Sequence, residues 1–523
     1  MSNTLSIYSR KKKVVWRDIL LIFLAALVLG APTLIYPFGR DQGQYAWIAE
    51  STLNGNLSYS DVFEIKPPFT HLVHQAALLF FGYDMASIRL LDLLWQFATA
   101  ILIYKIAIQI EQPQVTSIVA AVFYLLFYYH MDFWNSAQTD GFLSLPITAS
   151  ILFFLHAQKK NYFLLYVASG VAISLGILFK YPIGILIVFL LLLVLIRLKK
   201  NALVPSLWMG VGFAIPLTIS MLIMFLLGNL ADFLWIQSIY IPAYSTILHK
   251  DLSYTGGIML GFLGTLITPV PGWVSLCGLY GLFSRFGRSR WMQTAVLVAW
   301  WTSAVLHFVI QNKFYGYHAL PIYAPLALMT SNLFVDVRKT HGLIRFALGS
   351  IGIYLIAHLF FNSDFPQKYS RLYEVARGNI TLQMAYGNEL FNDHKDFSSR
   401  ANMQVAGYLN AKTNPAERVF IWGFEPGIYF LSQRQNATRF IYNITLYGPN
   451  ASLELRQAFL EEIREQIPIY IVIVMNDSMP FVTATSEDSW TAFNSFDEFH
   501  SFVMRNYRLE TTIEDFVIYR LEP

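Results

Sequence analysis

Charged residues are scarce in this chain. Asp, Glu, Lys and Arg make up 13% of its 523 residues, whereas soluble globular proteins carry about 25%. This shortage excludes an ordinary soluble protein. Hydrophobic residues make up 55% of the sequence, and the mean hydropathy is +0.46. These values are typical of a polytopic α-helical membrane protein.

Cysteine is almost absent, and the net charge is small. The single cysteine, Cys277, lies in an apolar run, so the chain forms no intramolecular disulfide and offers no cysteine cluster for a metal. The formal net charge is +4, from 37 basic and 33 acidic residues. No basic domain or stripe stands out, which excludes nucleic acid as a partner. Internal repeats and low-complexity tracts are also missing.

Apolar runs long enough to cross a bilayer recur over the first two thirds of the chain. Lys and Arg collect in short cytoplasmic loops, so the cluster from Arg10 to Lys13 places the N-terminus inside. Residues 67–81 are predicted to form an amphipathic helix that lies on the membrane. Eleven spans are predicted, at residues 18–38, 86–109, 114–132, 141–157, 162–179, 182–197, 203–228, 256–283, 292–311, 316–334 and 344–361.

From about residue 363 the composition changes, and no later segment is apolar enough to span. Strands are predicted at 418–423, 469–474 and 516–521, with a helix at 453–466. We therefore expect a membrane domain over residues 1–362 and a small α/β domain over 363–523. Eleven spans place the α/β domain on the outer face. The outer loops expected to carry the chemistry are 39–85, 133–140, 229–255 and 312–316.

A lone acidic residue, Asp41, follows the first apolar segment in the run Gly39-Arg40-Asp41-Gln42. Charged residues at the end of a membrane span are costly to desolvate, so they tend to mark a functional site. As a general base, Asp41 would take the proton from an acceptor hydroxyl while a sugar leaves its phosphate carrier. The structural alternatives are a helix cap and an ion pair with Arg40.

The next outer motif is Lys66-Pro67-Pro68. Two prolines fix the backbone and start a helix at its first turn. Helix N-termini favour anions, so Lys66 is a candidate phosphate ligand. The alternative is an ordinary lysine that reaches from an apolar surface to water.

Further charged and aromatic residues fall at the same predicted face. Asp140 would share a metal, bind sugar hydroxyls, orient the acceptor, or serve as the N-cap of the span at 141–157. Lys180 follows one apolar run and precedes another. The segment from Lys313 to Pro321 brings a cation together with aromatic rings, a combination that suits phosphate and sugar; its candidates are Tyr317 and His318.

A metal site is left open by the sequence. Asp41, Glu64 and Asp140 are the carboxylates that would hold a divalent cation at this face. No spacing of His or carboxylate residues requires one, so no cofactor is assigned.

The order of these motifs resembles the C-type glycosyltransferases of family 39, which include protein O-mannosyltransferases and lipid A aminoarabinose transferases. The likeness covers roughly residues 15–335. It rests on Asp41…Tyr45-Ala46…Ile48-Ala49, Lys66-Pro67-Pro68, Phe81-Gly82, Arg89-Leu90, Gln138-Thr139-Asp140, the run from Leu175 to Lys180, and Lys313…Tyr317-His318…Leu320-Pro321.

Two further details belong to this resemblance. The family commonly has Asp-Glu at the first motif, whereas Gln42 stands here in place of the Glu, which removes a second carboxylate. The stretch from Phe420 to Pro426 is similar to the outer domain of bacterial members.

The resemblance implies a membrane glycosyltransferase with a C-type fold in a bacterial inner membrane. The donor would be a sugar on polyprenyl phosphate, and the acceptor a lipid, glycan or protein on the periplasmic or exterior side. Asp41 would be the base in an inverting displacement. Lys66, Lys180, Lys313 and His318 would bind the donor phosphate, and Asp140, Glu64, Tyr45 and Tyr317 would bind acceptor, sugar or metal. The alternative is a lipid or glycan transporter or flippase, which would place polar residues near mid-membrane.

Overall fold

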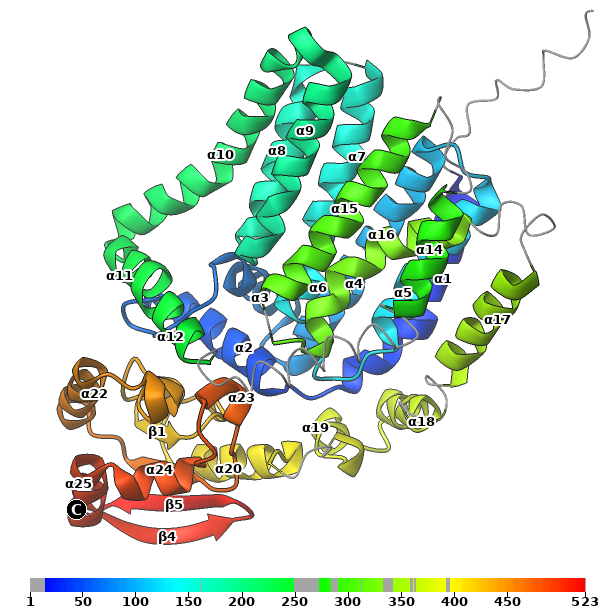
Figure 1. Cartoon of the computed structure of the whole chain (residues 1–523). Coiled ribbons are helices and arrows are strands. Elements are labelled where there is room, and N and C mark those ends of the chain that lie inside the picture. Colours follow the sequence, from blue (N-terminus) through cyan, green and yellow to red (C-terminus); the bar gives the residue numbers. More distant parts are fainter. Residues whose placement is uncertain are drawn as a thin grey trace, which may run out of the picture.

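The computed structural model describes residues 15–160, 162–248, 272–283, 290–311, 313–332, 342–357, 361, 364–391 and 396–522. Within these ranges the chain forms a helical bundle followed by a smaller domain that contains a β-sheet (Figure 1). The chain is a multi-pass integral membrane protein, as the sequence predicts.

Six helical segments are long and apolar enough to cross a membrane. They are Trp16–Ile35, Met85–Gln109, Thr139–Lys160, Tyr181–Asn201, Leu203–Leu227 and Trp291–Ile310. Five shorter apolar helices accompany them, so the described residues hold six to eleven apolar helices where eleven spans are expected. One of the shorter helices is Phe69–Phe81, which is predicted to lie on the membrane. The helices of the bundle are α1 (Trp16–Gly30), α3 (Phe69–Phe81), α4 (Met85–Gln109), α5 (Gln114–Tyr129), α6 (Thr139–Phe142), α7 (Ser144–Lys160), α8 (Phe163–Ile177), α9 (Ile185–Leu198), α10 (Leu203–Leu227), α14 (Val274–Phe283), α15 (Trp291–Ile310), α16 (Leu320–Ser331) and α17 (Gly342–Ala357).

Several predicted spans differ from the observed helices at their ends. The first, expected over 18–38, is α helical only to Gly30 and then continues as a 3-10 turn to Ile35, because Pro32 cannot donate an α-helical hydrogen bond. The span expected at 316–334 contains α16, which has 12 residues. Of the span expected at 256–283, only 272–283 lies within the described residues.

Two of the expected outer loops are largely helical. Residues 39–85 contain α2 (Arg40–Leu53) as well as α3. Residues 229–248 form α11 (Leu230–Trp235), a π-helical turn (Ile236–Tyr240) and α12 (Ile241–Leu248); the rest of that predicted loop lies outside the described residues. Both segments contact the C-terminal domain: α2 packs on α21 (Gly427–Ser432), and α12 contacts residues 480–483.

The C-terminal domain contains a five-stranded mixed sheet in the order β2-β1-β3-β5-β4. Strands β1 (Arg418–Trp422), β3 (Tyr470–Val474) and β5 (Phe516–Leu521) fall where the sequence predicts strands, and α22 (Leu453–Glu465) is the predicted helix. Strands β2 (Gln435–Asn436) and β4 (Tyr507–Ile513) were not predicted, since β2 has two residues and β4 has an exposed, polar sequence. The remaining helices are α18 (Phe365–Ala376), α19 (Leu382–Tyr386), α20 (Ser399–Lys412), α23 (Pro480–Thr483), α24 (Ser489–Ser495) and α25 (Asp497–Asn506).

The helix α2 lies between the bundle and the C-terminal domain (Figure 1). Gly43 of α2 meets Gly427 of α21 so closely that a Cβ on Gly43 would lie 2.6 Å from the Gly427 Cα. At the start of α2, the Arg40 Nε donates to Glu425 at 2.8 Å and the Arg40 Nη1 donates to Asp396 at 2.9 Å. The two domains are therefore fixed to each other at the residue that precedes Asp41.

Candidate active site

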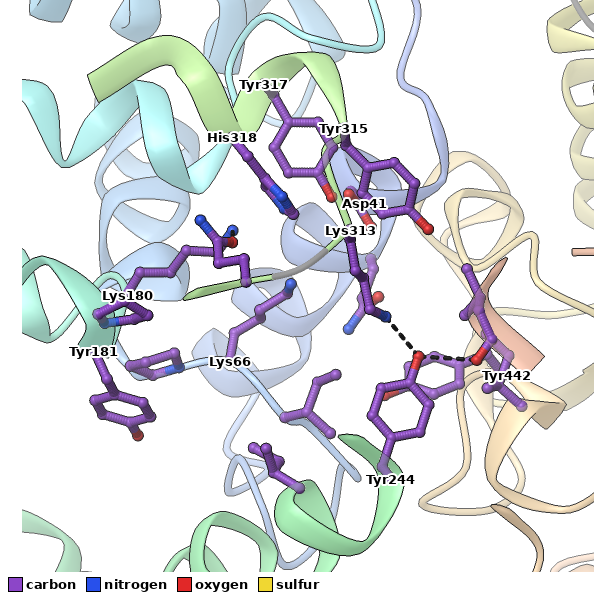
Figure 2. Close-up of a pocket in the computed structure, with 18 of the residues that line it drawn as sticks. Asp41, Lys66, Lys180, Tyr181, Tyr244, Lys313, Tyr315, Tyr317, His318 and Tyr442 are labelled. Carbon is purple, nitrogen blue, oxygen red and sulfur yellow. Dashed lines mark hydrogen bonds between the residues drawn. The ribbon is translucent and has the colours of Figure 1, made fainter. Parts of the chain in front are cut away.

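A cavity of about 260 Å³ lies where α2, the segment before α3, α12 and the C-terminal domain meet the ends of the bundle helices. Figure 2 shows the side chains that gather around it. Its lining combines one carboxylate and three lysines with many aromatic rings. The lining residues are Asp41, Gln44, Ile65, Lys66, Pro67, Lys180, Tyr181, Pro182, Tyr240, Ile241, Tyr244, Gln311, Lys313, Tyr315, Tyr317, His318, Phe424, Tyr442, Ile444 and Val482.

Asp41 lies in the first turn of α2 with its carboxylate in the cavity lining. Neither structural alternative for this residue is observed. The N-cap of α2 is Gly39, and Arg40 pairs with Glu425 and Asp396 instead of Asp41. Within the described part of the chain, no protein group forms an ion pair with the Asp41 carboxylate, which leaves it available to a ligand.

Lys66 lies just before α3, which begins at Phe69 directly after the two prolines, as predicted. Its ammonium group lines the cavity and forms no ion pair among the described residues. Its backbone N–H donates to Glu64 Oε1 at 2.5 Å. Glu64 itself is fully buried and does not line the cavity.

Glu64 therefore holds the Lys66 backbone through a hydrogen bond and does not itself reach the cavity. Its Oε2 also accepts a hydrogen bond from Gln44 Nε2 at 2.6 Å and lies 3.7 Å from His71 Nε2. Burial raises the pKa of Glu64 to about 7. Tyr45 is likewise buried beneath the cavity, where its ring contacts the rings of His71 and His74. Neither candidate is placed to touch a ligand in the cavity directly.

Lys180 reaches the cavity with its ammonium group held by Asp140. The Lys180 Nζ donates to Asp140 Oδ2 at 2.6 Å, and the His307 Nε2 lies 2.7 Å from Asp140 Oδ1. Asp140 is fully buried and is the second residue of α6, whose N-cap is Gln138, so the predicted N-cap role of Asp140 is wrong. A buried carboxylate needs such partners to offset its desolvation. Asp140 holds Lys180 with one oxygen and contacts His307 with the other.

Lys313 is held from the other side of the cavity. Its Nζ donates to the Tyr244 hydroxyl at 2.8 Å, and that hydroxyl donates to the backbone carbonyl of Val482 at 2.9 Å (Figure 2). The Lys313 Nζ also lies 4.7 Å from the centre of the Tyr244 ring. This chain of contacts joins a bundle loop, α12 and the C-terminal domain at one ammonium group.

Burial disfavours the charged forms of Lys313 and Lys180. Burial lowers the pKa of Lys313 to about 7, and the Lys66 charge adds to this effect while Asp41 opposes it. Burial lowers the pKa of Lys180 to about 8 even though the Asp140 carboxylate raises it. An anionic ligand would restore the charged forms, because an opposite charge favours protonated lysine.

Two aromatic candidates complete the lysine side of the cavity. Tyr317 lies under Lys180, with the Nζ 5.4 Å from the ring centre. The His318 ring packs edge-on against Tyr317 with centroids 4.5 Å apart, and only 3% of His318 is exposed. Both residues line the cavity, where Tyr317 stabilises the cation through its ring.

Gln42 is buried and is structural in this chain. Its Nε2 donates to the backbone carbonyls of Phe133, Trp134 and Ser136, and its Oε1 accepts from the Gly39 N–H. A glutamate in this position would face three carbonyl oxygens, which repel a carboxylate. The amide at position 42 therefore fits the 133–136 segment and supplies no acid to the cavity.

The carboxylates proposed for a metal do not converge. Asp41 faces the cavity, whereas Glu64 and Asp140 are each buried with protein partners. Among the residues that the structure describes, no group of three or more His, Cys, Asp or Glu residues could hold a metal ion.

Sequence reasoning missed the residues that come from distant segments. His307 lies in the last turn of α15 and Gln311 is the C-cap of this helix. Nothing in the local sequence marks them as partners of Asp140 and Lys180. Tyr240 and Tyr244 were visible only as aromatic residues of an outer segment. The C-terminal domain contributes Phe424, Tyr442, Ile444 and Val482 to the cavity. No sequence motif indicates that these residues belong to the site.

Comparison with known proteins agrees with this architecture. Residues 65–238 match the family model described as dolichyl-phosphate-mannose-protein mannosyltransferase. That segment contains Lys66, Asp140 and Lys180, so the resemblance drawn from the motifs is confirmed over this part of the chain. None of the curated protein sequences is significantly similar to the chain.

The fold as a whole resembles the folds of two solved membrane proteins. ArnT from Cupriavidus metallidurans bound to undecaprenyl phosphate matches with a TM-score of 0.58 and 14% identity, over 96% of this chain and 97% of that chain. Its apo state matches with a TM-score of 0.52 over the same shares of both chains. The arabinofuranosyltransferase AftD from Mycobacteria matches with a TM-score of 0.50 and 12% identity, over 98% of this chain and 40% of that chain.

Proposed function

We propose that this protein is a membrane glycosyltransferase that moves a sugar from a polyprenyl-phosphate donor to an acceptor hydroxyl or phosphate at the extracytoplasmic face. One observation carries the proposal. Asp41, a carboxylate with no ion-pair partner among the described residues, shares a cavity with three lysines that come from three separate segments of the chain. The family match and the fold likeness support the same class of reaction.

In the proposed mechanism, Asp41 accepts the proton of the acceptor hydroxyl. The acceptor oxygen then forms a bond to the anomeric carbon while the bond from that carbon to the phosphate oxygen breaks. The phosphate leaves with the electron pair of the broken bond. Because attack and departure occur on opposite sides of the carbon, the product has the inverted configuration.

The lysines stabilise the charge that develops on the departing phosphate. Positioned cations in a cavity with little water are far more effective than the same groups in bulk solvent. Lys66 is free to contact the phosphate directly, whereas Lys180 and Lys313 are held in place by Asp140 and Tyr244. His318 and Tyr317 would complete the donor side, and the C-terminal residues Phe424 and Tyr442 would face the acceptor.

The flippase alternative has less support. The buried polar residues within α4, Asp92 and Gln96, bond to each other and to tyrosines of α5, and neither lines the cavity. The charged residues instead gather at one end of the bundle, which suits a reaction at the membrane surface more than passage through it.

The direct test uses purified protein in nanodiscs with polyprenyl-phosphate sugars extracted from the native membrane. Wild-type protein should release free polyprenyl phosphate and form a product heavier by one sugar residue. Asp41→Asn keeps the shape of the side chain but cannot accept the proton, so turnover should fall by about 10²–10⁴-fold. Donor bound by the variant without loss of sugar would support the assignment; near-native turnover would contradict it.

A further inference from the structure

A second cavity, of about 420 Å³, lies at the opposite end of the bundle from the candidate active site. It is formed where α8 and α10 begin and by the turn that joins α9 to α10. From this cavity α8 runs for 15 residues to Ile177, three residues before Lys180, which separates the two sites by about 22 Å. The lining residues are Phe163, Tyr166, Lys200, Asn201, Leu203, Val204, Pro205 and Trp208.

The shape of this cavity depends on the close packing of α8 against α10. A Cβ on Gly170 would lie 2.1 Å from the Met209 carbonyl oxygen, and a Cβ on Gly212 would lie 2.1 Å from the Val167 carbonyl oxygen. Larger side chains at these two positions would separate the backbones. The glycines therefore fix the spacing of α8 and α10 beyond their first turns, next to the end of the helices where the cavity lies.

Lys200 is the one charged residue in the cavity lining, and the segments that form the cavity carry no carboxylate. The sequence contains no Asp or Glu from Gly141 to Ala231. Lys200 lines the cavity, and Lys159, Lys160, Arg197 and Lys199 belong to the same end of the bundle. Among the described residues, none of these cations forms an ion pair with a carboxylate. The positive-inside rule accounts for their side of the membrane, but it does not account for a lysine in the wall of a cavity.

The rest of the lining matches the boundary between lipid headgroups and acyl chains. Trp208 is 38% exposed, and its ring packs against Phe163 with centroids 5.0 Å apart. Tyr and Trp prefer this depth of the bilayer. Leu203 and Val204, which are 66% and 60% exposed, continue the lining as an apolar surface. These apolar side chains would not contribute to the binding of a small inorganic anion, whereas they would contact the acyl chains of a lipid.

We infer that this cavity binds an anionic phospholipid of the cytoplasmic leaflet. Lys200 and Asn201 would contact the headgroup phosphate, and the neighbouring cations would provide a positive field around it. Trp208 and Phe163 would pack along the glycerol and upper acyl chains. The lipid would fill the gap between α8 and α10 at the end of the bundle remote from the sugar-transfer site, and its binding does not depend on the proposed reaction.

The test measures quenching of Trp208 fluorescence by lipids brominated along their acyl chains. Full-length protein is reconstituted in phosphatidylcholine nanodiscs that contain either brominated phosphatidylglycerol or brominated phosphatidylcholine at the same low mole fraction. The Trp208 signal is the difference between the wild-type protein and Trp208→Phe. Quenching by phosphatidylglycerol should reach half its maximum at a several-fold lower mole fraction than quenching by phosphatidylcholine.

Lys200→Gln should raise that mole fraction for phosphatidylglycerol about fivefold, the usual contribution of one cation near anionic lipid. Lys105→Gln is the matched control, because Lys105 is also an exposed lysine on the predicted inner side but does not line the cavity, and it should have no effect. Equal quenching by the two lipids, or wild-type behaviour of Lys200→Gln, would overturn the inference. Native mass spectrometry provides a second readout: fewer phosphatidylglycerol molecules should remain bound to Lys200→Gln than to Lys105→Gln.

Discussion

Asp41 and Lys66 differ from the other charged residues of the cavity because no described protein group pairs with them. Lys180 and Lys313, in contrast, are held by Asp140 and by the Tyr244 hydroxyl. An unpaired charge in a partly enclosed site is expensive to keep unless a ligand contacts it. At the scale of single residues, these two side chains should therefore respond most directly to the donor and the acceptor.

The first residue-scale prediction concerns Lys66. Lys66→Ala removes the cation that is free to contact the donor phosphate, and it should raise the donor KM and lower kcat together. Lys66→Arg keeps the charge with a different geometry, so it should retain more activity than the alanine variant. Steady-state kinetics with purified donor measure KM and kcat for both variants. If Lys66→Ala used the donor like the wild-type protein, Lys66 would be an ordinary interfacial lysine.

The second residue-scale prediction concerns pH. Because burial lowers the pKa of Lys313 to about 7 and that of Lys180 to about 8, both ammonium groups are charged below pH 7 and lose their protons as the pH rises. The donor is a phosphodiester with a constant charge over this range. Donor affinity should therefore fall as the pH increases from 7 to 9, by up to about tenfold per pH unit for each lysine.

Lys313→Arg provides the control for this effect, since arginine stays protonated. Its donor affinity should remain constant through pH 7 and weaken only above pH 8, where Lys180 titrates. A donor KM that does not change with pH in the wild-type protein would show that the lysines do not bind the phosphate.

At the scale of elements, α2 determines where Asp41 lies. Its first residue, Arg40, is buried and paired with Glu425 of the C-terminal domain, and Asn402 Nδ2 donates to the other oxygen of that glutamate at 2.7 Å. Glu425 belongs to the stretch that resembles the outer domain of bacterial relatives. Its contact with Arg40 gives this stretch a physical role, which is to anchor α2 beside the cavity.

Gly43→Ala should test this role of α2. The new methyl group would lie 2.6 Å from the Gly427 Cα, so α2 would have to move away from α21 and carry Asp41 with it. A displacement of about 1 Å can lower a rate on the order of 10²-fold. The expected result is a large loss of kcat in a folded protein whose donor affinity is less affected.

Gly210→Ala is the matched control for Gly43→Ala. It also adds a methyl group to a helix, but no atom lies within 4 Å of the position that its Cβ would take. Transfer by this variant should equal that of the wild-type protein. Equal activity in Gly43→Ala and Gly210→Ala would show that the contact between α2 and α21 does not position Asp41.

The helices and strands that depend on local pattern were predictable. The apolar runs of α4 and α10 and the strand β3 are visible in the sequence because each is one continuous stretch of mainly apolar residues. Asp41, Lys66, Lys180 and Lys313 were identifiable because charge is rare in this chain. Contacts between segments that are far apart in the chain could not be predicted, because no local pattern in the sequence indicates them. Asp140 and His307 are 167 residues apart, and Arg40 and Glu425 are 385 residues apart.

At the scale of the whole molecule, the C-terminal domain closes one side of the cavity, so it must lie on the same side of the membrane as Asp41. The positive-inside rule predicts that this side lies outside the cytoplasm. We predict that Glu465→Cys, at an exposed position of α22, is labelled by an impermeant thiol reagent in intact cells when Cys277 is replaced by alanine.

Asn201→Cys in the same background is the control for this labelling. Asn201 is exposed at the opposite end of the bundle, and its cysteine should react only after the cells are lysed. The reverse pattern, with Glu465→Cys protected and Asn201→Cys labelled, would place the site on the cytoplasmic side and refute an extracytoplasmic reaction.

The most direct measurement of the central claim is mass spectrometry of the lipids and glycoconjugates of cells that carry either wild-type protein or Asp41→Asn at equal expression. If the protein transfers a sugar from a polyprenyl-phosphate donor, the variant cells should accumulate one polyprenyl-phosphate sugar. They should also lose, from one lipid, glycan or protein, a mass equal to that same sugar residue. Identical lipid and glycoconjugate masses in the two strains would contradict the account.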